Sequence, residues 1–303
     1  MIEPQGTVIG PLLFLTYIND LPNAITHSKT KLFADDSMLL NEIKTDQDQI
    51  KLQEDLRALE SWEEQWQMNF NPSKCNSMTA NSGKKETLKK DYYIHGQKLE
   101  YSKSSKYLGV TITEDMRWTQ HIDMLASKGH RAVGFLRRNF SSCSTKAKAT
   151  TYTTMVRPVL EYASSVWDPH LVRDSQKIEK VQRSASRYVF NNYNRTPGTV
   201  TNLLESLQWD TLEKRREISR LAMIYRIENG LVDLNPSCFY NKADSRTRGN
   251  KIFQERPSNP VFRDSFFPKT LSHWNKLPPR LTQAKTLGTF KHGVGCYLQS
   301  HTI

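Results

Sequence analysis

Two adjacent carboxylates, Asp35 and Asp36, are the residues of this sequence best suited to metal chemistry. Short apolar runs flank them, at 32–34 and 38–40, which predicts a β-hairpin with both carboxylates at its tip. Neighbouring carboxylates repel each other, so a cation or a set of donors must neutralise them. Mg²⁺ binds one or two carboxylates together with phosphate oxygens, and two such ions assist phosphoryl transfer. A solvated turn without metal is the alternative that the pair alone leaves open.

An apolar helix is predicted upstream of the hairpin. Gly6 permits a turn, and Thr7 can cap a helix N-terminus. Residues 8–18 are apolar almost all round, so we expect this helix to be buried. The run has no basic stretch before it and is too short to span a bilayer, so neither a signal peptide nor a membrane segment is predicted.

A long helix is predicted downstream, over residues 46–68. Leu52, Leu56, Leu59 and Trp66 form one apolar stripe at helical spacing, and we expect the acidic residues on the other face to be solvated. A polar loop over 81–90 follows, and residues 92–99 and 106–112 are each predicted to form a short strand.

Charge divides the chain unevenly. The 303 residues carry 43 Lys and Arg and 31 Asp and Glu, a formal charge of +12. Up to Cys75 there are 6 basic and 12 acidic residues, and from Asn76 onward 37 basic and 19 acidic. The basic part predicts a polyanionic partner, with an ordinary basic soluble protein as the alternative. The four cysteines are far apart, which argues against a zinc knuckle and a disulfide framework.

Two helices of the basic part are predicted to present cations on one face. The first spans 174–188, with Ile178, Val181, Ala185 and Tyr188 facing a core, and the second starts near Asp210 and stops at Gly230. A solvated helix face is the alternative to contact with a nucleic-acid backbone. The predicted backbone contacts are Lys180, Arg183, Arg187, Arg215, Arg216 and Arg220.

Several segments, in this order, resemble motifs of non-LTR retrotransposon reverse transcriptases of the jockey type. The segment 4–14, PQGTVIGPLLF, is similar to motif B, and 17–22, YINDLP, to its continuation. The segment 33–36, FADD, is similar to motif C, 66–75 to motif D and 106–112, KYLGVTI, to motif E. Looser similarity to the thumb and the C-terminal tail covers 157–163, 167–169 and 274–278.

The resemblance implies an α+β fold: a partial right-hand polymerase palm, with an antiparallel sheet and packed helices, before a mainly helical thumb and C-terminal region. The expected divisions are 1–115, 116–195 and 196–303. In this family a motif A strand with a further catalytic aspartate precedes motif B, and only three residues precede Pro4 here. We therefore expect an N-terminally truncated fragment that is inactive alone.

The resemblance also assigns roles and partners. It implies Mg²⁺ or Mn²⁺, only if the missing motif A aspartate is supplied. It also implies deoxynucleoside triphosphates, an element RNA template and a DNA primer or target, in the nucleus and cytoplasm. The implied residues are Pro4, Gln5 and Gly6 at the nucleotide and template; Asp35 and Asp36 at the metal; Lys74 as a proton donor; and Tyr107, Leu108 and Gly109 at the primer end. A surface lysine without a chemical role and a purely structural hairpin are the alternatives for the last two.

Two other interpretations stay open. The chain could be a non-catalytic nucleic-acid-binding remnant, an idea supported by basic residues that alternate with phenylalanines between 246 and 267. It could also be an unstable relic of a decayed element, as an incompletely covered helix at 8–18 would suggest.

Overall fold

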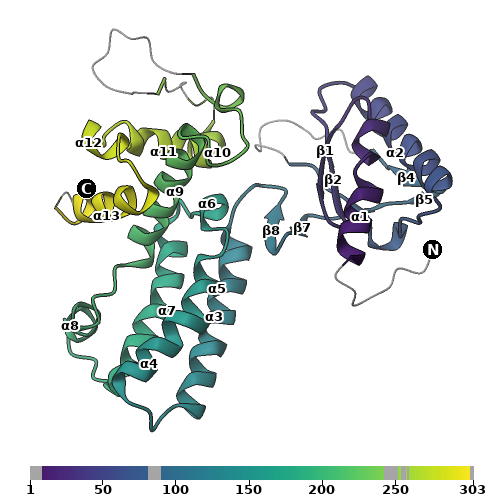
Figure 1. The fold of residues 1–303 in the computed structure, drawn as a ribbon. Helices are drawn as coiled ribbons and strands as arrows, with labels where there is room; N and C mark the ends of the chain where they lie inside the picture. Colours follow the sequence, from purple (N-terminus) through teal and green to yellow (C-terminus); the bar gives the residue numbers. More distant parts are fainter. Residues whose placement is uncertain (1–8, 81–89, 242–251, 254–256, 258, 301–303) are drawn as a thin grey trace. The chain divides into compact units, whose positions relative to one another are not determined.

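The computed structural model describes residues 9–80, 90–241, 252–253, 257 and 259–300. The chain divides into two compact units, Met1–Arg117 and Trp118–Ile303, which are named here the N-terminal unit and the helical unit (Figure 1). The predicted loop at 81–90 lies outside the described residues except for Lys90. Among the described residues, no helix has both the length and the apolar character that a membrane span requires.

The N-terminal unit mixes helices with small sheets, which confirms the predicted α+β class at this coarse level. Each sheet in its described part has two strands, and β1–β2, β4–β5 and β7–β8 are antiparallel hairpins whereas β3–β6 is parallel. Its elements are α1 Gly10–Ile18, the 3₁₀-helix η1 Leu21–Ala24, β1 Lys29–Phe33, β2 Asp36–Leu40, α2 Asp46–Trp66, the 3₁₀-helix η2 Pro72–Lys74, β3 Asn76–Ser77, β4 Tyr93–Ile94, β5 Gln97–Lys98, β6 Glu100–Tyr101, β7 Ser104–Tyr107 and β8 Val110–Thr113.

The long predicted helix is confirmed as α2. A capping box starts it, in which Thr45 and Asp48 exchange hydrogen bonds between side chain and backbone, and Gln67 ends it in a left-handed conformation. Leu56 and Leu59 are buried as expected, and Trp62 is buried between them and the end of the helix. Together with Ile18 and Leu21 these residues form the core of the unit.

The prediction that the first helix is buried is wrong. Ile18 of α1 packs into the core, and Tyr17 meets Trp66 edge-on at 5.1 Å between ring centroids. On the rest of the helix, Leu12 is 63% exposed and Leu13 58%. An apolar helix was expected to be covered on all sides, but the described residues cover only one side of α1.

The two strand predictions after residue 90 are also corrected. Residues 92–99 form the hairpin β4–β5, and 106–112 fall in the hairpin β7–β8, so the chain reverses where a continuous strand was expected. Both reversals use two residues with positive φ, His95 and Gly96 in one and Leu108 and Gly109 in the other. Positive φ at both positions is typical of a type I′ turn, the turn that matches the twist of a hairpin.

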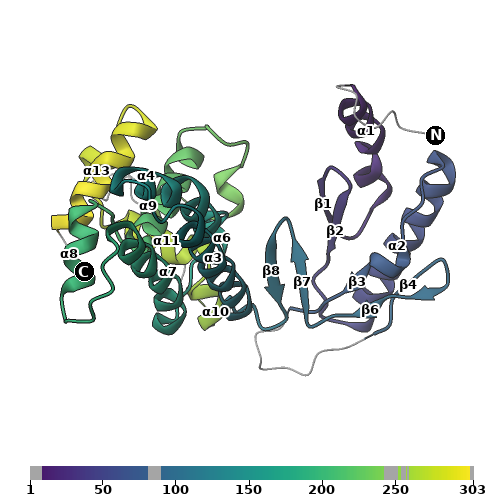
Figure 2. The same ribbon diagram turned by 90° about the horizontal axis from the view of Figure 1, so that it is seen from below.

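The helical unit contains helices throughout its described part. In Figure 2, which shows the same fold from below, its long helices α3 and α7 can be followed side by side. Its elements are α3 Thr119–Asn139, α4 Thr145–Thr151, a π-helical turn η3 Tyr152–Val156, α5 Arg157–Glu161, α6 Ser164–Trp167, α7 Val172–Phe190, α8 Thr199–Ser206, α9 Leu212–Glu228, the 3₁₀-helix η4 Pro236–Cys238, α10 Pro260–Arg263, α11 Phe266–Trp274, α12 Pro279–Thr282 and α13 Leu287–Ser300.

Close packing joins α3 to α7. The predicted core positions Ile178, Val181, Ala185 and Tyr188 of α7 are buried, which confirms that stripe. Gly129 of α3 lies where an added Cβ would come within 2.9 Å of Val181 and 2.8 Å of Leu160. The absence of a side chain at Gly129 therefore permits this close approach.

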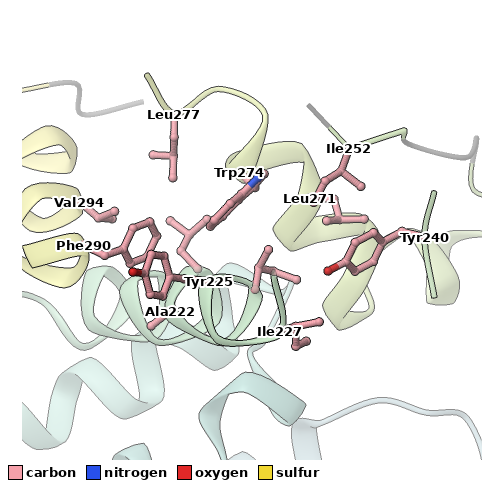
Figure 3. Packing of buried hydrophobic residues seen from close by; sticks show 12 residues of the cluster. Ala222, Tyr225, Ile227, Tyr240, Ile252, Leu271, Trp274, Leu277, Phe290 and Val294 are labelled. Atoms are coloured by element: carbon pink, nitrogen blue, oxygen red, sulfur yellow. The ribbon is translucent and has the colours of Figure 1, made fainter. Parts of the chain in front are cut away.

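A second core lies between α9, α11 and α13. Tyr225 of α9 stacks on Phe290 of α13 with ring centroids 4.6 Å apart, and Trp274 of α11 lies 5.6 Å from Phe290 (Figure 3). The Tyr225 hydroxyl donates to the carbonyl of Ala284 at 2.6 Å. Leu221, Ala222 and Tyr225 of α9 are buried here. The N-cap is Thr211, whose side chain accepts from the backbone of Lys214, rather than the predicted Asp210.

Candidate functional site

Asp35 and Asp36 lie at the tip of the β1–β2 hairpin, as the sequence predicted. Phe33 pairs with Asp36 across the strands, so Ala34 and Asp35 form a two-residue turn. Ala34 has φ +50°, and Asp35 is not among the positive-φ residues. Positive φ at the first turn position alone is typical of a type II′ turn, where glycine is the preferred residue. The hairpin thus carries local backbone strain beside its carboxylates.

Both carboxylates of the hairpin tip are exposed, and they follow each other in the chain. Two hard oxygen donors in this arrangement fit Mg²⁺ or Mn²⁺, ions that complete their coordination with water and phosphate oxygens. Asp35 and Asp36 would hold the ion, which supplies Lewis-acid stabilisation of charge on a phosphoryl group. Among the described residues, no group of three or more His, Cys, Asp and Glu that could hold a metal is present.

The base of the hairpin is held by a carboxylate that was expected to be solvated. Asp55 of α2 is 1% exposed and accepts three consecutive backbone N–H groups, from Thr26 at 3.1 Å, His27 at 3.2 Å and Ser28 at 2.7 Å. Burial alone would raise the pKa of Asp55, but hydrogen bonds from these residues outweigh it and hold the pKa below its usual value.

The predicted solvated face of α2 needs a second correction at Glu63. This carboxylate is 2% exposed, accepts from the backbone N–H of Phe70, and lies 2.6 Å from Nε2 of His95. Ten residues earlier on α2, Gln53 donates to and accepts from the backbone of Tyr93, at 2.9 Å each way. Helical periodicity predicts that the acidic residues of α2 face solvent. In the structure, Asp55 and Glu63 instead bind the chain segments beside the helix.

Lys74, the predicted proton donor, is exposed at the end of η2. Asn71 caps this short helix by accepting from the backbone of Ser73 at 3.1 Å. The cap fixes the backbone at Lys74, while its ammonium group reaches into solvent. The predicted nucleotide and template residues Pro4, Gln5 and Gly6 lie outside the described residues.

The predicted primer-end residues Tyr107, Leu108 and Gly109 occupy the reversal between β7 and β8. Tyr107 pairs with Val110, which leaves Leu108 and Gly109 as the turn, with φ +45° and +81°. Leu108 is strained there, because a leucine in left-handed backbone lacks the freedom of glycine. The turn presents a partly exposed leucine and an exposed glycine backbone at the hairpin tip.

Among the predicted backbone-contacting cations of α7, the structure brings two to the surface. Lys180 and Arg183 are exposed on the side of the helix opposite its buried stripe. Arg187 is partly buried, and its Nε has no hydrogen-bond partner among the described residues.

The predicted cations of α9 are mostly engaged inside the unit. Arg215 forms a two-pronged ion pair with Glu161, including a 2.9 Å bond between Nη2 and Oε2, which raises the pKa of Arg215. Arg216 and Arg220 are only 1% and 4% exposed. Their burial leaves no surface by which a nucleic-acid backbone could reach them. The sequence pattern missed their counter-ion, Asp168.

Asp168 binds three cations from two distant helices. Arg216 donates to its Oδ1 at 2.8 Å, Arg220 Nε lies 3.1 Å from Oδ2, and Lys269 donates to Oδ2 at 2.5 Å. Burial alone would raise the pKa of Asp168, but Arg220, Lys269 and Arg216 hold it below its usual value. The carboxylate therefore stays charged inside the unit, and its partners join α9 and α11 to the end of α6.

The outer face of α3 combines cations with exposed apolar side chains. Lys128, Arg131 and Arg138 are all exposed. Met124 is 39% exposed and Phe135 45%, and each lies three or four residues from the nearest of these cations. These two residues were not predicted, although their helical spacing from the cations is visible in the sequence.

Comparison with known proteins identifies one family and several relatives. The reverse transcriptase (RNA-dependent DNA polymerase) family matches residues 2–112. The chain is 25% identical over 198 residues to the probable RNA-directed DNA polymerase from transposon X-element of Drosophila melanogaster, covering 61% of this chain and 21% of that protein. No solved structure matches.

Further relatives come from the same class of elements. The chain is 26% identical over 233 residues to the probable RNA-directed DNA polymerase from transposon BS of Drosophila melanogaster, covering 73% of this chain and 25% of that protein. It is 24% identical over 200 residues to the RNA-directed DNA polymerase from mobile element jockey of Drosophila melanogaster, covering 61% and 21%. The chain thus spans between a fifth and a quarter of these relatives. The matches identify residues 2–112 as reverse transcriptase sequence of the non-LTR retrotransposon type.

Proposed function

We propose that the N-terminal unit forms part of the palm of an RNA-directed DNA polymerase, and that Asp35 and Asp36 hold its divalent metal. The observation that carries this proposal is the pair of exposed carboxylates at a hairpin tip, inside the stretch that matches the reverse transcriptase family. Substrates are deoxynucleoside triphosphates, an RNA template and a DNA primer. The metal when bound stabilises charge on the phosphates.

The other predicted residues serve this reaction by position. Lys74 donates a proton to the departing pyrophosphate, which requires its ammonium to reach the phosphates from η2. The Leu108–Gly109 turn supports the primer end, where the exposed glycine backbone permits close approach. Pro4, Gln5 and Gly6 line the nucleotide and template.

In this proposal residues 116–195 form a thumb and residues 196–303 a C-terminal region, which together hold the nucleic acid. The helical unit, Trp118–Ile303, carries 29 Lys and Arg against 14 Asp and Glu. Lys180 and Arg183 of α7 and the exposed cations of α3 contact phosphates, while Met124 and Phe135 add apolar contact. Arg215, Arg216 and Arg220 instead stabilise the unit from within, because their partners are Glu161 and Asp168.

We propose further that the 303 residues alone do not polymerise. Two-metal phosphoryl transfer needs a ligand that bridges both ions in addition to the Asp35 and Asp36 pair. Among the residues that the structure describes, no third His, Cys, Asp or Glu is grouped with this pair. The test is primer extension on an RNA template with Mg²⁺ or Mn²⁺, using the purified chain and its Asp35→Asn variant. Robust incorporation that Asp35→Asn abolishes would contradict this part of the proposal.

A second candidate is a non-catalytic nucleic-acid-binding protein, which the excess of 15 positive charges in the helical unit favours. Under this alternative, binding to an RNA–DNA duplex weakens steeply with salt and is unchanged when Asp35 and Asp36 are both replaced by asparagine. Under the polymerase proposal, Mg²⁺ and a matching nucleoside triphosphate strengthen duplex binding, and the double replacement removes that gain. A filter-binding or anisotropy titration separates the two outcomes.

A further inference from the structure

Helix α2 contacts both ends of the segment that connects α1 to the carboxylate hairpin. At one end, the indole N–H of Trp62 donates to Oδ1 of Asp20 at 3.0 Å, just after α1. At the other end, Asp55 accepts the backbone N–H groups of Thr26, His27 and Ser28, directly before β1. Asp20 lies in the YINDLP segment, for which the sequence suggested no contact.

The two contacts come from one rigid element. Asp55 and Trp62 are seven residues apart, so they lie on the same face of α2 about 10 Å apart along its axis. Both side chains are buried, at 1% and 5% exposed. A rigid helix with two buried attachment points fixes the ends of the 20–28 segment relative to each other.

Further packing makes the hairpin depend on this attachment. Leu32 of β1 and Leu39 of β2 pack partly buried against the core that Leu56, Leu59 and Trp62 build. In the described residues β1–β2 is a two-stranded sheet without another strand beside it. Its orientation is therefore set by the packing against α2 and by the hydrogen bonds at its base.

We propose that Asp55 and Trp62 are positioning residues for the Asp35–Asp36 metal site, with Asp55 orienting the hairpin and Trp62 orienting the end of α1. The proposal rests on the proposed function, because it assumes that the carboxylate pair binds the metal. Asp55 acts about five strand residues away from the tip, through the backbone of β1. The carboxylate is suited to this because one group accepts three consecutive N–H groups, which no neutral side chain can do.

The test combines hydrogen exchange with metal binding on the full chain. Exchange is followed by mass spectrometry in peptides covering 19–33 and in peptides of α2. Binding of Mn²⁺ is titrated by electron paramagnetic resonance, and the Asp35→Asn, Asp36→Asn double variant defines how much of it belongs to the site. The variants are Asp55→Asn, Trp62→Phe and, as a matched control on the exposed face of α2, Glu64→Gln.

In Asp55→Asn we expect at least tenfold faster exchange at 26–33 with α2 protection retained, and about tenfold weaker Mn²⁺ binding at the site, as for other residues that orient metal ligands. In Trp62→Phe, which keeps an aromatic ring but removes the donor, faster exchange is confined to 19–24 and Mn²⁺ affinity changes less. Glu64→Gln changes neither measurement. Retained protection at 26–33 in Asp55→Asn would overturn the attachment, and lost protection with unchanged Mn²⁺ affinity would overturn the positioning role.

The measurements also distinguish two further outcomes. If Asp55→Asn loses α2 protection as well, the unit has unfolded in this variant. The proposal is then tested by Trp62→Phe alone, and unchanged exchange at 19–24 in that variant overturns it. If wild type and the double variant bind Mn²⁺ equally, the metal role in the proposed function fails and the positioning role with it. Exchange at 26–33 then still shows whether Asp55 attaches the hairpin.

Discussion

The two units each bury an aspartate and keep it charged by opposite means. Asp55 of the N-terminal unit accepts backbone N–H groups from three consecutive residues, whereas Asp168 of the helical unit binds three cationic side chains. In both, the partners outweigh burial and hold the pKa of the carboxyl below its usual value.

The difference lies in where the partners come from. The donors to Asp55 belong to one short segment, so losing the carboxylate frees one stretch of backbone. The cations at Asp168 come from α9 and α11, about 50 and 100 residues away along the chain, and Arg216 and Arg220 would stay buried without their counter-ion. The first arrangement fixes local geometry, and the second holds separate helices together.

The largest expected effect is therefore that of Asp168→Asn. The variant leaves Arg216, Arg220 and Lys269 without a counter-ion, and removing one partner from a buried ion pair costs about 3–5 kcal/mol. Thermal unfolding followed by far-ultraviolet circular dichroism should show a large fall in Tm. The matched control, Asp233→Asn, replaces an exposed aspartate of the same unit and should leave Tm within about 1 °C of wild type. An equal Tm in Asp168→Asn and Asp233→Asn would show that the buried Asp168 contributes no more to stability than the exposed Asp233.

Asp55→Asn should have a smaller effect on stability, confined to the N-terminal unit. The amide keeps an oxygen acceptor but loses the charge and turns a donor toward N–H groups, which costs about 1–3 kcal/mol. Hydrogen exchange is measured at increasing urea concentrations in peptides that belong to only one unit. It gives the free energy of unfolding of each unit separately. The helical unit should be unaffected; a loss there would mean that the contacts of Asp55 are not local.

A third change tests local backbone geometry in the N-terminal unit. Leu108→Asn replaces a strained left-handed residue by one that tolerates positive φ in a type I′ turn, and should stabilise the unit by about 0.5–1 kcal/mol. Urea unfolding measures the gain. Leu231→Asn, at an exposed leucine of the other unit, is the comparison and should give none. A destabilised Leu108→Asn would show that side-chain contacts of Leu108 outweigh its backbone strain.

The smallest effect is a change in the pH dependence of the helical unit. Glu179 of α7 accepts from the backbone N–H of Glu213 at 2.8 Å, and burial raises its pKa above 4.5. Because the pKa of Glu179 is raised in the folded state, its contribution to stability is complete below pH 4.5 and falls as pH rises through the pKa of the folded state. Asp55 and Asp168 have the opposite sign, because lowered pKa values contribute above pH 3.8 and are lost in acid.

Glu179→Gln isolates that contribution. The variant should equal wild type in stability near pH 4 and exceed it slightly at pH 7, because an uncharged amide avoids the cost of burying a carboxylate. Tm measured at several pH values gives the difference. A constant difference from pH 4 to pH 7 would show that Glu179 does not titrate in this range.

Much of the local architecture could be predicted from the sequence. The short apolar runs on either side of Asp35 and Asp36 specified the hairpin and its tip, and the spacing of Ile178, Val181, Ala185 and Tyr188 specified the buried face of α7. Such patterns succeed because they record local geometry and the side that faces a core.

The partners of charged residues could not be predicted in this way. Asp55 and Arg216 occupy positions that look solvated from periodicity, and their burial depends on residues 27 and 48 positions distant. The two turns at His95–Gly96 and Leu108–Gly109 could not be predicted for another reason. A non-glycine residue at positive φ is not marked by its residue type in the sequence. The apolar sequence of α1 predicted a buried helix. It gave no sign that the described residues would leave most of this helix exposed.

The π-helical turn at Tyr152–Val156 affects how this chain should be aligned with others. Its hydrogen bonds join residues five apart rather than four, so the turn accommodates one residue more than an α-helix over the same rise. Pro158, which has no N–H to donate, lies two residues after the turn, within α5. A related chain with an uninterrupted helix here should be shorter by one residue, and the gap belongs between 151 and 157. Placed elsewhere, it would shift α5 and the following segment, as far as Asp168, by one residue against their true equivalents.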